Sequence, residues 1–215
     1  MARRIQRQII IHLFLLLSIL AGITACQKTK SIQTVPYRLT LEDKALLREG
    51  DIVLRRGEGM LSSFIARHLC DSVPASHCGI LVREGGEWQV IHTLSLDVSD
   101  TDGVQCCSLN EFMDDCMPGS ICVLRCLSDS TGRMAAYARY YLAAHKPFDR
   151  KFSLADTTSF FCSELPYRIL KDRLHIDLTP ETGHLKFSAF FHPAYFRVVY
   201  RGEAYGLGAR GKSGR

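Results

Sequence analysis

Three side chains of the sequence have the types needed for nucleophilic catalysis by a thiol, namely Cys162, His77 and His92. A cysteine attacks a carbonyl as the thiolate, and a free thiol with a pKa of about 8.5 is only partly ionised at neutral pH. A histidine can act as the base that removes the proton, and a second polar group can hold that histidine in place. Such a set would transfer an acyl group from an amide or ester to sulfur.

Cys162 lies in the stretch FFCSELPYRILKD, where a loop gives way to a helical pattern over residues 162–174. The start of a helix carries unpaired N–H groups and partial positive charge, which lower the pKa of a thiol. The same N–H groups make the backbone amide of Cys162 a candidate oxyanion donor. Taken alone, Cys162 could equally be a buried thiol at a helix end. Pro166 predicts either a tight helix start at Cys162 or a kink.

The two histidines fall on a predicted β-hairpin. The strand-like runs SHCGILV and EWQVIHT flank a Gly85–Gly86 pair, which is a strong signal for a two-residue turn. With that turn, His92 faces Gly79, so His77 and His92 are diagonal neighbours on one face, roughly 7–8 Å apart at the backbone. Their imidazoles could then meet over Gly79, which has no side chain. A three-residue turn would break this register and leave two unrelated strand-end histidines.

A metal site is the alternative use of the same side chains. His77 and His92, with Cys162 as a third ligand, would resemble a zinc site with an open position. The sequence contains nine cysteines but no CxxC pair, so a zinc cluster is not indicated. We therefore expect neither a cofactor nor a metal. Disulfides are possible in an exported protein, and their pairing does not follow from the sequence.

The remaining patterns predict an α+β domain. Strands are expected at residues 50–56, 76–82, 87–93, 120–127 and 194–202, and helices at 59–70, 108–115, 130–146 and 162–174. The second of these helices carries a capping box formed by Ser108 and Glu111. Because the strands are mostly joined by hairpins, an antiparallel sheet with helices is favoured over a parallel α/β sheet.

Both ends of the chain differ from this domain. Arginines, an apolar run and the small residues ITA before Cys26 resemble a bacterial lipoprotein signal, which implies cleavage before Cys26 and acylation of its thiol. An ordinary signal peptide or an uncleaved anchor is the alternative. We expect a membrane-anchored lipoprotein of the bacterial cell envelope. The expected divisions are a signal at 1–25, a lipidated tether at 26–40, a catalytic domain at 41–200 and a flexible basic tail at 201–215.

The charge argues against a nucleic-acid partner. The formal net charge is +5, but three arginines of the leader and a net +3 in the last fifteen residues account for more than all of it. The body of the chain is therefore near −1. A nucleic-acid-binding domain would carry a clustered basic surface instead.

Four segments in order carry a family resemblance: GDIVLRR, SHCGILV, WQVIHT and KPFDRKFSLADTTSFFCSEL. Together they resemble the YiiX-type branch of the permuted papain-like enzymes in the NlpC superfamily, over about residues 50–196. The resemblance implies a permuted papain-like fold, with an antiparallel sheet or half-barrel packed against helices. It also implies Cys162 as nucleophile, His77 as catalytic histidine and His92 at the third, polar position.

The sequence departs from that family pattern at three places. The third position is often a glutamate in this branch, where this chain has His92. Phe161 stands where the family often has a tyrosine, and Pro166 replaces an aliphatic residue. The orienting role of His92 survives this change, because a histidine is known there in non-permuted relatives.

The resulting expectation is a cysteine hydrolase or acyl transferase that uses Cys162, His77 and His92 on amide or ester bonds. Its substrates would be cell-envelope peptides or lipids, both of which a surface lipoprotein reaches. A non-catalytic lipid- or peptide-binding lipoprotein on the same fold is the second hypothesis. The Cys/His metal site is the third.

Overall fold

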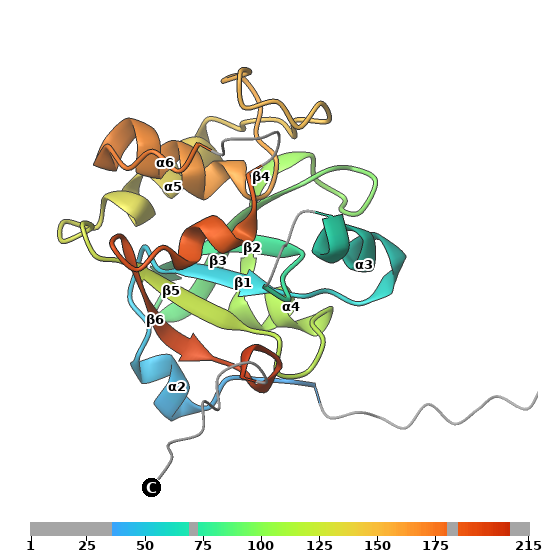
Figure 1. The fold of residues 1–215 in the computed structure, drawn as a ribbon, viewed down its shortest axis with the longest axis vertical. Helices are drawn as coiled ribbons and strands as arrows, with labels where there is room; N and C mark the ends of the chain where they lie inside the picture. Colours follow the sequence, from blue (N-terminus) through green and yellow to red (C-terminus); the bar gives the residue numbers. More distant parts are fainter. Residues whose placement is uncertain (1–35, 69–72, 180–184, 207–215) are drawn as a thin grey trace, which may run out of the picture. The chain divides into compact units, whose positions relative to one another are not determined.

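A six-stranded antiparallel sheet organises the part of the chain that the computed structural model describes, which is residues 36–68, 73–179 and 185–206 (Figure 1). The order of strands across the sheet is β4-β3-β2-β1-β5-β6. The strands are β1 (Ile52–Arg55), β2 (His77–Glu84), β3 (Glu87–Leu94), β4 (Gly103–Ser108), β5 (Cys122–Cys126) and β6 (Phe196–Arg201). The predicted signal segment, the predicted acylation site Cys26 and residues 27–35 of the predicted tether lie outside the described residues.

Helices fill the connections between strands. The α-helices are α2 (Leu41–Ala45), α3 (Gly59–His68), α4 (Leu109–Asp114), α5 (Arg133–Ala143) and α6 (Glu164–Leu174), and the 3₁₀ helices are η1 (Phe187–Phe191) and η2 (Glu203–Tyr205). The capping box predicted for Ser108 and Glu111 is present at the start of α4. Among the described residues, no helix combines the length and apolar character needed to cross a bilayer.

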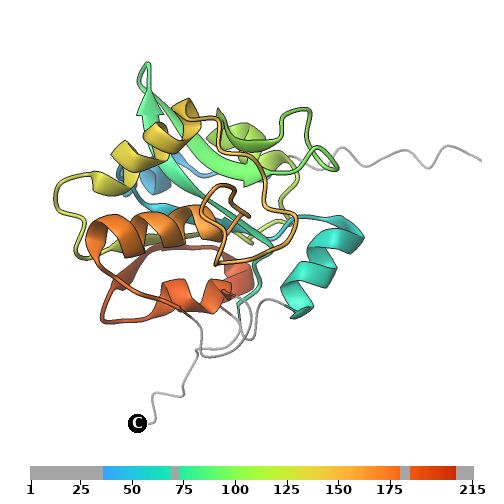
Figure 2. The same ribbon diagram turned by 90° about the horizontal axis from the view of Figure 1, so that it is seen from above.

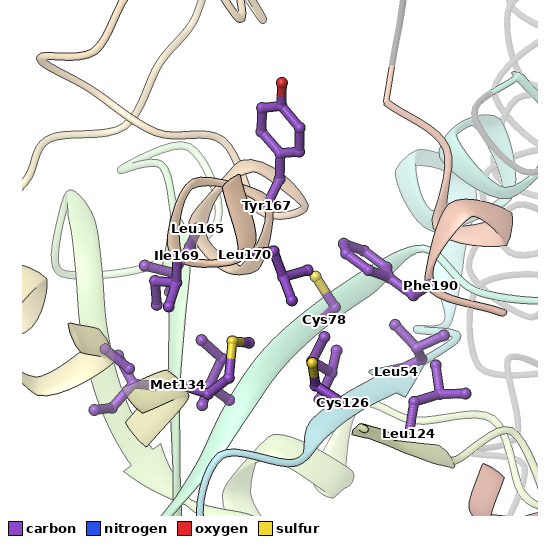
Figure 3. Packing of buried hydrophobic residues seen from close by; sticks show 14 of the residues in the cluster. Leu54, Cys78, Leu124, Cys126, Met134, Leu165, Tyr167, Ile169, Leu170 and Phe190 are labelled. Atoms are coloured by element: carbon purple, nitrogen blue, oxygen red, sulfur yellow. The ribbon is translucent and has the colours of Figure 1, made fainter. Parts of the chain in front are cut away.

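Both faces of the sheet are buried, and the sheet separates two apolar clusters. Helices α5 and α6 lie side by side over one face and form the first cluster with alternate residues of the strands, such as Leu54, Cys78 and Leu124 (Figures 1 and 2). In Figure 3, Ile169 and Leu170 lie on the side of α6 that faces the strands, whereas Tyr167 points away from them. The intervening residues, such as Val53 and Leu81, face the second cluster, to which α4 contributes Phe112. The α+β prediction is confirmed.

One strand was not foreseen, and one helix is less buried than its pattern suggested. Strand β4 has the sequence GVQCCS, which lacks the β-branched run that marks the other strands, and it lies at the sheet edge. Helix α3 forms where the apolar spacing predicted it. However, Leu61 and Phe64, two of the residues that defined its apolar stripe, are 55% and 58% exposed.

Both ends of the described chain contact the rest of the domain. Near the first end, Leu39 is buried, and the Tyr37 hydroxyl lies 2.8 Å from that of Tyr200. Near the other end, Gly202 and Ala204 donate backbone hydrogen bonds to the carbonyls of Ile121 and Gly119. The boundaries expected for the tether, the catalytic domain and the tail stay predictions, and residues 207–215 lie outside the described part.

The start of α6 explains how the chain tolerates Pro166. The helix begins at Glu164, after a turn in which the N–H groups of Glu164 and Leu165 both reach the carbonyl of Phe161. Pro166 is then the third helical residue, where an N–H group would have no intrahelical partner. The Cys162 carbonyl, which an N–H at position 166 would face, accepts from Cys78 Sγ instead. Cys162 lies in the turn that immediately precedes the helix.

A buried ion pair ties the loop before Cys162 to this helix. Arg168 donates to the Glu164 carboxylate from Nε at 2.9 Å and from Nη2 at 2.7 Å. Its Nη2 also donates to the carbonyls of Leu154 and Asp156. Glu164 in turn accepts the N–H of Phe161 at 3.3 Å. Burial raises the pKa of Glu164 to about 7, although Arg168 acts in the opposite direction. The loop and the Cys162 turn are thus fastened to the first turn of α6.

Gly79 is expected to tolerate no side chain. A Cβ built there would lie 2.4 Å from Val90 Cγ1, 2.9 Å from the carbonyl oxygen of Ile91 and 3.1 Å from His92 Cβ. We predict that Gly79→Ala lowers the free energy of unfolding by about 1–3 kcal/mol, measured by urea denaturation. Gly85→Asn is the control, because Gly85 has open space and a φ of +58° that asparagine accepts. Equal stabilities of the two variants would show that the close packing at Gly79 is unimportant.

Removing Arg168 should destabilise the protein strongly, because it leaves the Glu164 carboxylate buried without its cation. We predict a loss of about 3–5 kcal/mol for Arg168→Ala in urea denaturation near pH 8. The loss should be smaller near pH 5, because the pKa of Glu164 is already raised in the fold and a protonated carboxyl carries no uncompensated charge.

The matched control for this change is Arg139→Ala. Arg139 pairs with Glu49 at the surface, where both side chains are more than two-fifths exposed. Breaking this exposed pair should cost less than about 1 kcal/mol at either pH. A similar cost for the two variants, or a loss for Arg168→Ala that does not depend on pH, would contradict the prediction.

Candidate active site

The β2–β3 hairpin has the register that the sequence predicted. Gly85 and Gly86 form the two-residue turn with φ values of +58° and +90°, conformations that favour glycine. Glu84 pairs with Glu87, and Gly79 pairs with His92. His77 and His92 therefore project from the same face of the sheet as diagonal neighbours.

The two imidazoles meet directly. His77 Nε2 lies 2.9 Å from His92 Nδ1, which is a hydrogen-bond distance, and the rings meet edge to face with centroids 5.1 Å apart. Both side chains are buried, with 6% and 4% of their surfaces exposed. Since Gly79 has no side chain at the position opposite His92, the rings have the space to approach. The predicted juxtaposition of these histidines is confirmed.

Both imidazoles are neutral at neutral pH. Burial, followed by the positive charges of Arg55 and His92, holds the pKa of His77 well below its ordinary value of 6.5. Burial and Arg55 also lower the pKa of His92 to about 3. A neutral imidazole carries one N–H and one bare nitrogen, so one ring must donate and the other accept in the contact between them. Which ring donates is fixed by the tautomers.

An aromatic ring and a cation surround the pair on the α4 side. Phe112 lies with its ring centroid 5.6 Å from each imidazole, and Arg55 places its guanidinium carbon 4.9 Å from the same centroid. Arg55 is also the cross-strand partner of His77. Its Nε and Nη1 atoms are buried and make no hydrogen bond within the described part of the chain, and Asp115 lies 3.9 Å from Nη1. This weakly compensated cation favours the uncharged forms of both histidines.

Cys162 is attached to the histidine strand through its backbone. Cys78, the residue after His77, donates from Sγ to the carbonyl oxygen of Cys162 at 3.2 Å. Successive residues of a strand point to opposite faces, so Cys78 points to the α6 side and His77 to the side of Phe112. The half-buried Cys162 therefore lies next to the first residues of β2, and its carbonyl group contacts this strand.

A second thiol at the histidine pair escaped the sequence analysis. Cys107 Sγ lies 3.4 Å from His92 Nε2, the ring nitrogen that does not face His77. In the β3–β4 register His92 pairs with Gln105, so Cys107 is two residues further along the same face. The sequence feature that could have revealed Cys107 is the alternation of residues in GVQCCS, which places Gln105 and Cys107 on one face of a strand. This feature is informative only if residues 103–108 are known to form a strand beside β3.

The donor set does not match the metal site considered as an alternative. Among the described residues, no group of three or more His, Cys, Asp or Glu side chains is arranged to hold a metal ion. One nitrogen of each ring, His77 Nε2 and His92 Nδ1, faces the other ring at hydrogen-bond distance. In this arrangement those two nitrogens contact each other and do not join Cys162 around a common point.

Comparison with solved structures gives the fold of a known protein. The metalloprotein YiiX from Escherichia coli O157:H7 superposes with a TM-score of 0.58 at 18% sequence identity, over 72% of this chain and 97% of that one. At this identity the likeness concerns the fold, and the description as a metalloprotein applies to that protein. Among curated proteins, no sequence matches the chain.

A protein-family comparison matches residues 46–190, which is more than half of the chain and includes Cys162, His77 and His92. The matching model is that of the permuted papain-like amidase enzymes of the YaeF/YiiX type, the C92 family. Such membership supports an amidase-type cysteine hydrolase activity. The matched residues contain the hairpin that joins the two histidines and the half-buried cysteine before α6. The chain belongs to the permuted papain-like amidase family.

Proposed function

We propose that this protein is a cysteine amidase in which Cys162 is the nucleophile, His77 its base and His92 the residue that orients His77. The observation that carries the proposal is the buried hydrogen bond between His77 Nε2 and His92 Nδ1, next to the strand residue that holds the Cys162 carbonyl. That hydrogen bond occupies Nε2 of His77. Nδ1 is then the nitrogen of His77 that acts on the thiol.

The neutral state of His77 defines the kind of base catalysis. Because the pKa of His77 lies well below 6.5, the imidazole is unprotonated at neutral pH and can accept a proton. Cys162 starts as a thiol and transfers its proton to His77 Nδ1 as sulfur attacks the carbonyl carbon. The charge formed on His77 is offset by the negative charge that develops on the oxyanion.

The remaining steps follow from the same groups. The backbone N–H of Cys162, at the turn before α6, is the proposed oxyanion donor. His77 returns its proton to the departing amine or alcohol as the carbon–heteroatom bond breaks, which leaves a thioester on Cys162. Water then attacks the thioester, its proton passes to His77, and the released thiolate is protonated again. Another nucleophile in place of water would make the protein an acyl transferase.

The position of Cys162 sets a geometric condition on this mechanism. The side chains of Cys78 and His77 lie on opposite faces of the sheet. In the proposed mechanism, the Cys162 sulfur therefore reaches the His77 imidazole at the end of β2, past the first residue of the strand, and not across the sheet. His77 is that first residue. The contact between the Cys162 carbonyl and Cys78 supports a nucleophile at this end of the strand.

The proposed substrates are amides or esters of the cell envelope, either peptides or lipids. Predicted export and acylation at Cys26 would hold the catalytic domain at a membrane surface, where both kinds of substrate occur. The near-neutral body of the chain suits such substrates better than it suits nucleic acid.

Selective alkylation tests the assignment of Cys162. We predict that iodoacetamide at neutral pH modifies Cys162 at least about tenfold faster than the exposed Cys106, because His77 accepts the proton of one thiol and not of the other. His77→Ala should remove most of this difference, and peptide mass spectrometry gives the rate at each cysteine.

Cys106 is a suitable internal reference because the residue is exposed, so the reagent can reach it. Partial desolvation of its thiol raises the pKa of Cys106, as it does for other thiols of the sheet. The proposal fails if Cys162 reacts no faster than Cys106 in the folded protein. It also fails if His77→Ala, with its fold retained by circular dichroism, alkylates at the wild-type rate.

Metal removal separates the amidase proposal from metal-dependent chemistry. We predict that EDTA dialysis leaves the rate of 4-nitrophenyl acetate cleavage unchanged, while Cys162→Ser abolishes it, because the described histidines face each other and not a common ion. Elemental analysis of the purified full-length chain should give substoichiometric zinc. One zinc per chain, lost in His92→Ala together with the esterase rate, would contradict this prediction.

A further inference from the structure

Cys107 extends the histidine pair into a chain of three side chains. Its Sγ lies 3.4 Å from His92 Nε2, and His92 Nδ1 lies 2.9 Å from His77 Nε2. Both nitrogens of His92 are therefore engaged, one by the proposed base and the other by a thiol. The thiol comes from β4, whose pairing with β3 places Gln105 opposite His92 and Cys107 two residues further along.

The protons in such a chain are coupled. Each neutral imidazole has one N–H, so only two arrangements satisfy all the contacts. In the first, His77 Nε2–H donates to His92 Nδ1 and His92 Nε2–H donates to Cys107 Sγ. In the second, the Cys107 S–H donates to His92 Nε2 and His92 Nδ1–H donates to His77 Nε2. The thiol is both a weak donor and a weak acceptor, so it can end the chain in either arrangement.

The two arrangements have opposite consequences for His77. The first leaves its Nδ1 bare and able to take a proton from Cys162. The second puts a hydrogen on Nδ1, so that His77 has no free nitrogen to act as a base. Once His77 has become an imidazolium, its Nε2–H must donate to His92 Nδ1, and the hydrogen of His92 must lie on Nε2. The reaction therefore requires an acceptor at the position that Cys107 occupies.

We propose that Cys107 is a positioning residue that accepts the His92 Nε2–H and thereby holds His77 in the tautomer with a bare Nδ1. This inference rests on the proposed function, because it assigns a role to Cys107 through His77. Burial keeps Cys107 a thiol at neutral pH, with a pKa raised to about 12, so its sulfur acts by hydrogen bonding and not as a second nucleophile. Arg55 supports the arrangement by disfavouring protonation of either ring.

The tautomers can be measured without any substrate. In protein labelled with ¹⁵N-histidine, nitrogen spectra distinguish a bare ring nitrogen from one that carries hydrogen. We expect the full-length wild-type chain at neutral pH to show hydrogen on Nε2 of both His77 and His92. Cys107→Ala should give a mixture of tautomers at His92 and His77, and should slow alkylation of Cys162 about three- to tenfold, the effect of one lost hydrogen bond.

Two further variants separate positioning from general packing. Cys107→Ser retains a side-chain acceptor and should restore the wild-type tautomers. Cys106→Ala changes the exposed neighbour on the same strand and should leave both the tautomers and the alkylation rate of Cys162 unchanged. Thermal melting of all variants identifies any that do not fold. If Cys107→Ala does not fold, the nitrogen spectra of the wild type and of Cys107→Ser still test the proposed tautomers.

The outcomes distinguish this inference from the proposed function. Hydrogen on Nδ1 of His77 in the wild-type spectrum would overturn it, as would Cys107→Ala with unchanged tautomers and an unchanged rate. If instead Cys162 is not selectively alkylated but the tautomers shift in Cys107→Ala, the amidase mechanism fails while the role of Cys107 in setting the tautomers stands.

Discussion

The hydrogen bond between His77 and His92 depends on the register of one hairpin. A two-residue turn at Gly85–Gly86 places Gly79 opposite His92, and this puts both imidazoles on one face at diagonal positions. A shift of one residue would send one ring to the opposite face of the sheet. The glycines are therefore part of the site: two allow the turn, and Gly79 leaves the space in which the rings meet.

Burial gives this hydrogen bond its chemical character. The pair lies against Phe112, within the field of a guanidinium whose nearest carboxylate is 3.9 Å away and largely exposed. Desolvation and the Arg55 charge both act against an imidazolium, so the resting rings are neutral. A thiolate–imidazolium pair at rest, common among cysteine enzymes with solvated histidines, is thus disfavoured. In the proposed mechanism, the charge on His77 becomes favourable only when a partner charge develops beside it, during attack on a carbonyl.

The sequence was sufficient for the features that follow from local rules. Alternating apolar residues, the Gly85–Gly86 turn and the box at Ser108 and Glu111 gave the hairpin, the histidine pair and the start of α4, and all are present. Features that depend on contacts between distant parts of the chain could not be predicted from the sequence. Strand β4 takes its conformation from pairing with β3 and has little strand propensity of its own. The contact of Cys107 with His92 was therefore not predicted.

The burial of the Glu164–Arg168 ion pair is another feature that the sequence could not predict. Glu164 and Arg168 are four residues apart in a helix, a spacing usually found on solvated surfaces. Their burial results from the loop that folds over them and supplies carbonyls to Arg168. Likewise, Leu61 and Phe64 have helical apolar spacing in α3, yet both are more than half exposed. Periodicity identifies a helix, but only the surrounding fold decides what covers it.

The permuted order of the chain divides the site into a local part and a distant part. The histidines are fifteen residues apart on one hairpin, so their contact forms with the hairpin itself. Cys162 arrives much later in the chain, and its place depends on the docking of α6, whose Leu165, Ile169 and Leu170 are fully buried in the first cluster. Because Glu164 and Arg168 fasten the preceding loop to that same helix, the helix and the Cys162 turn dock as one piece. Packing changes in α6 should then move the sulfur while the imidazole pair stays in place. The contact between Cys78 and the Cys162 carbonyl is one place where these two parts meet.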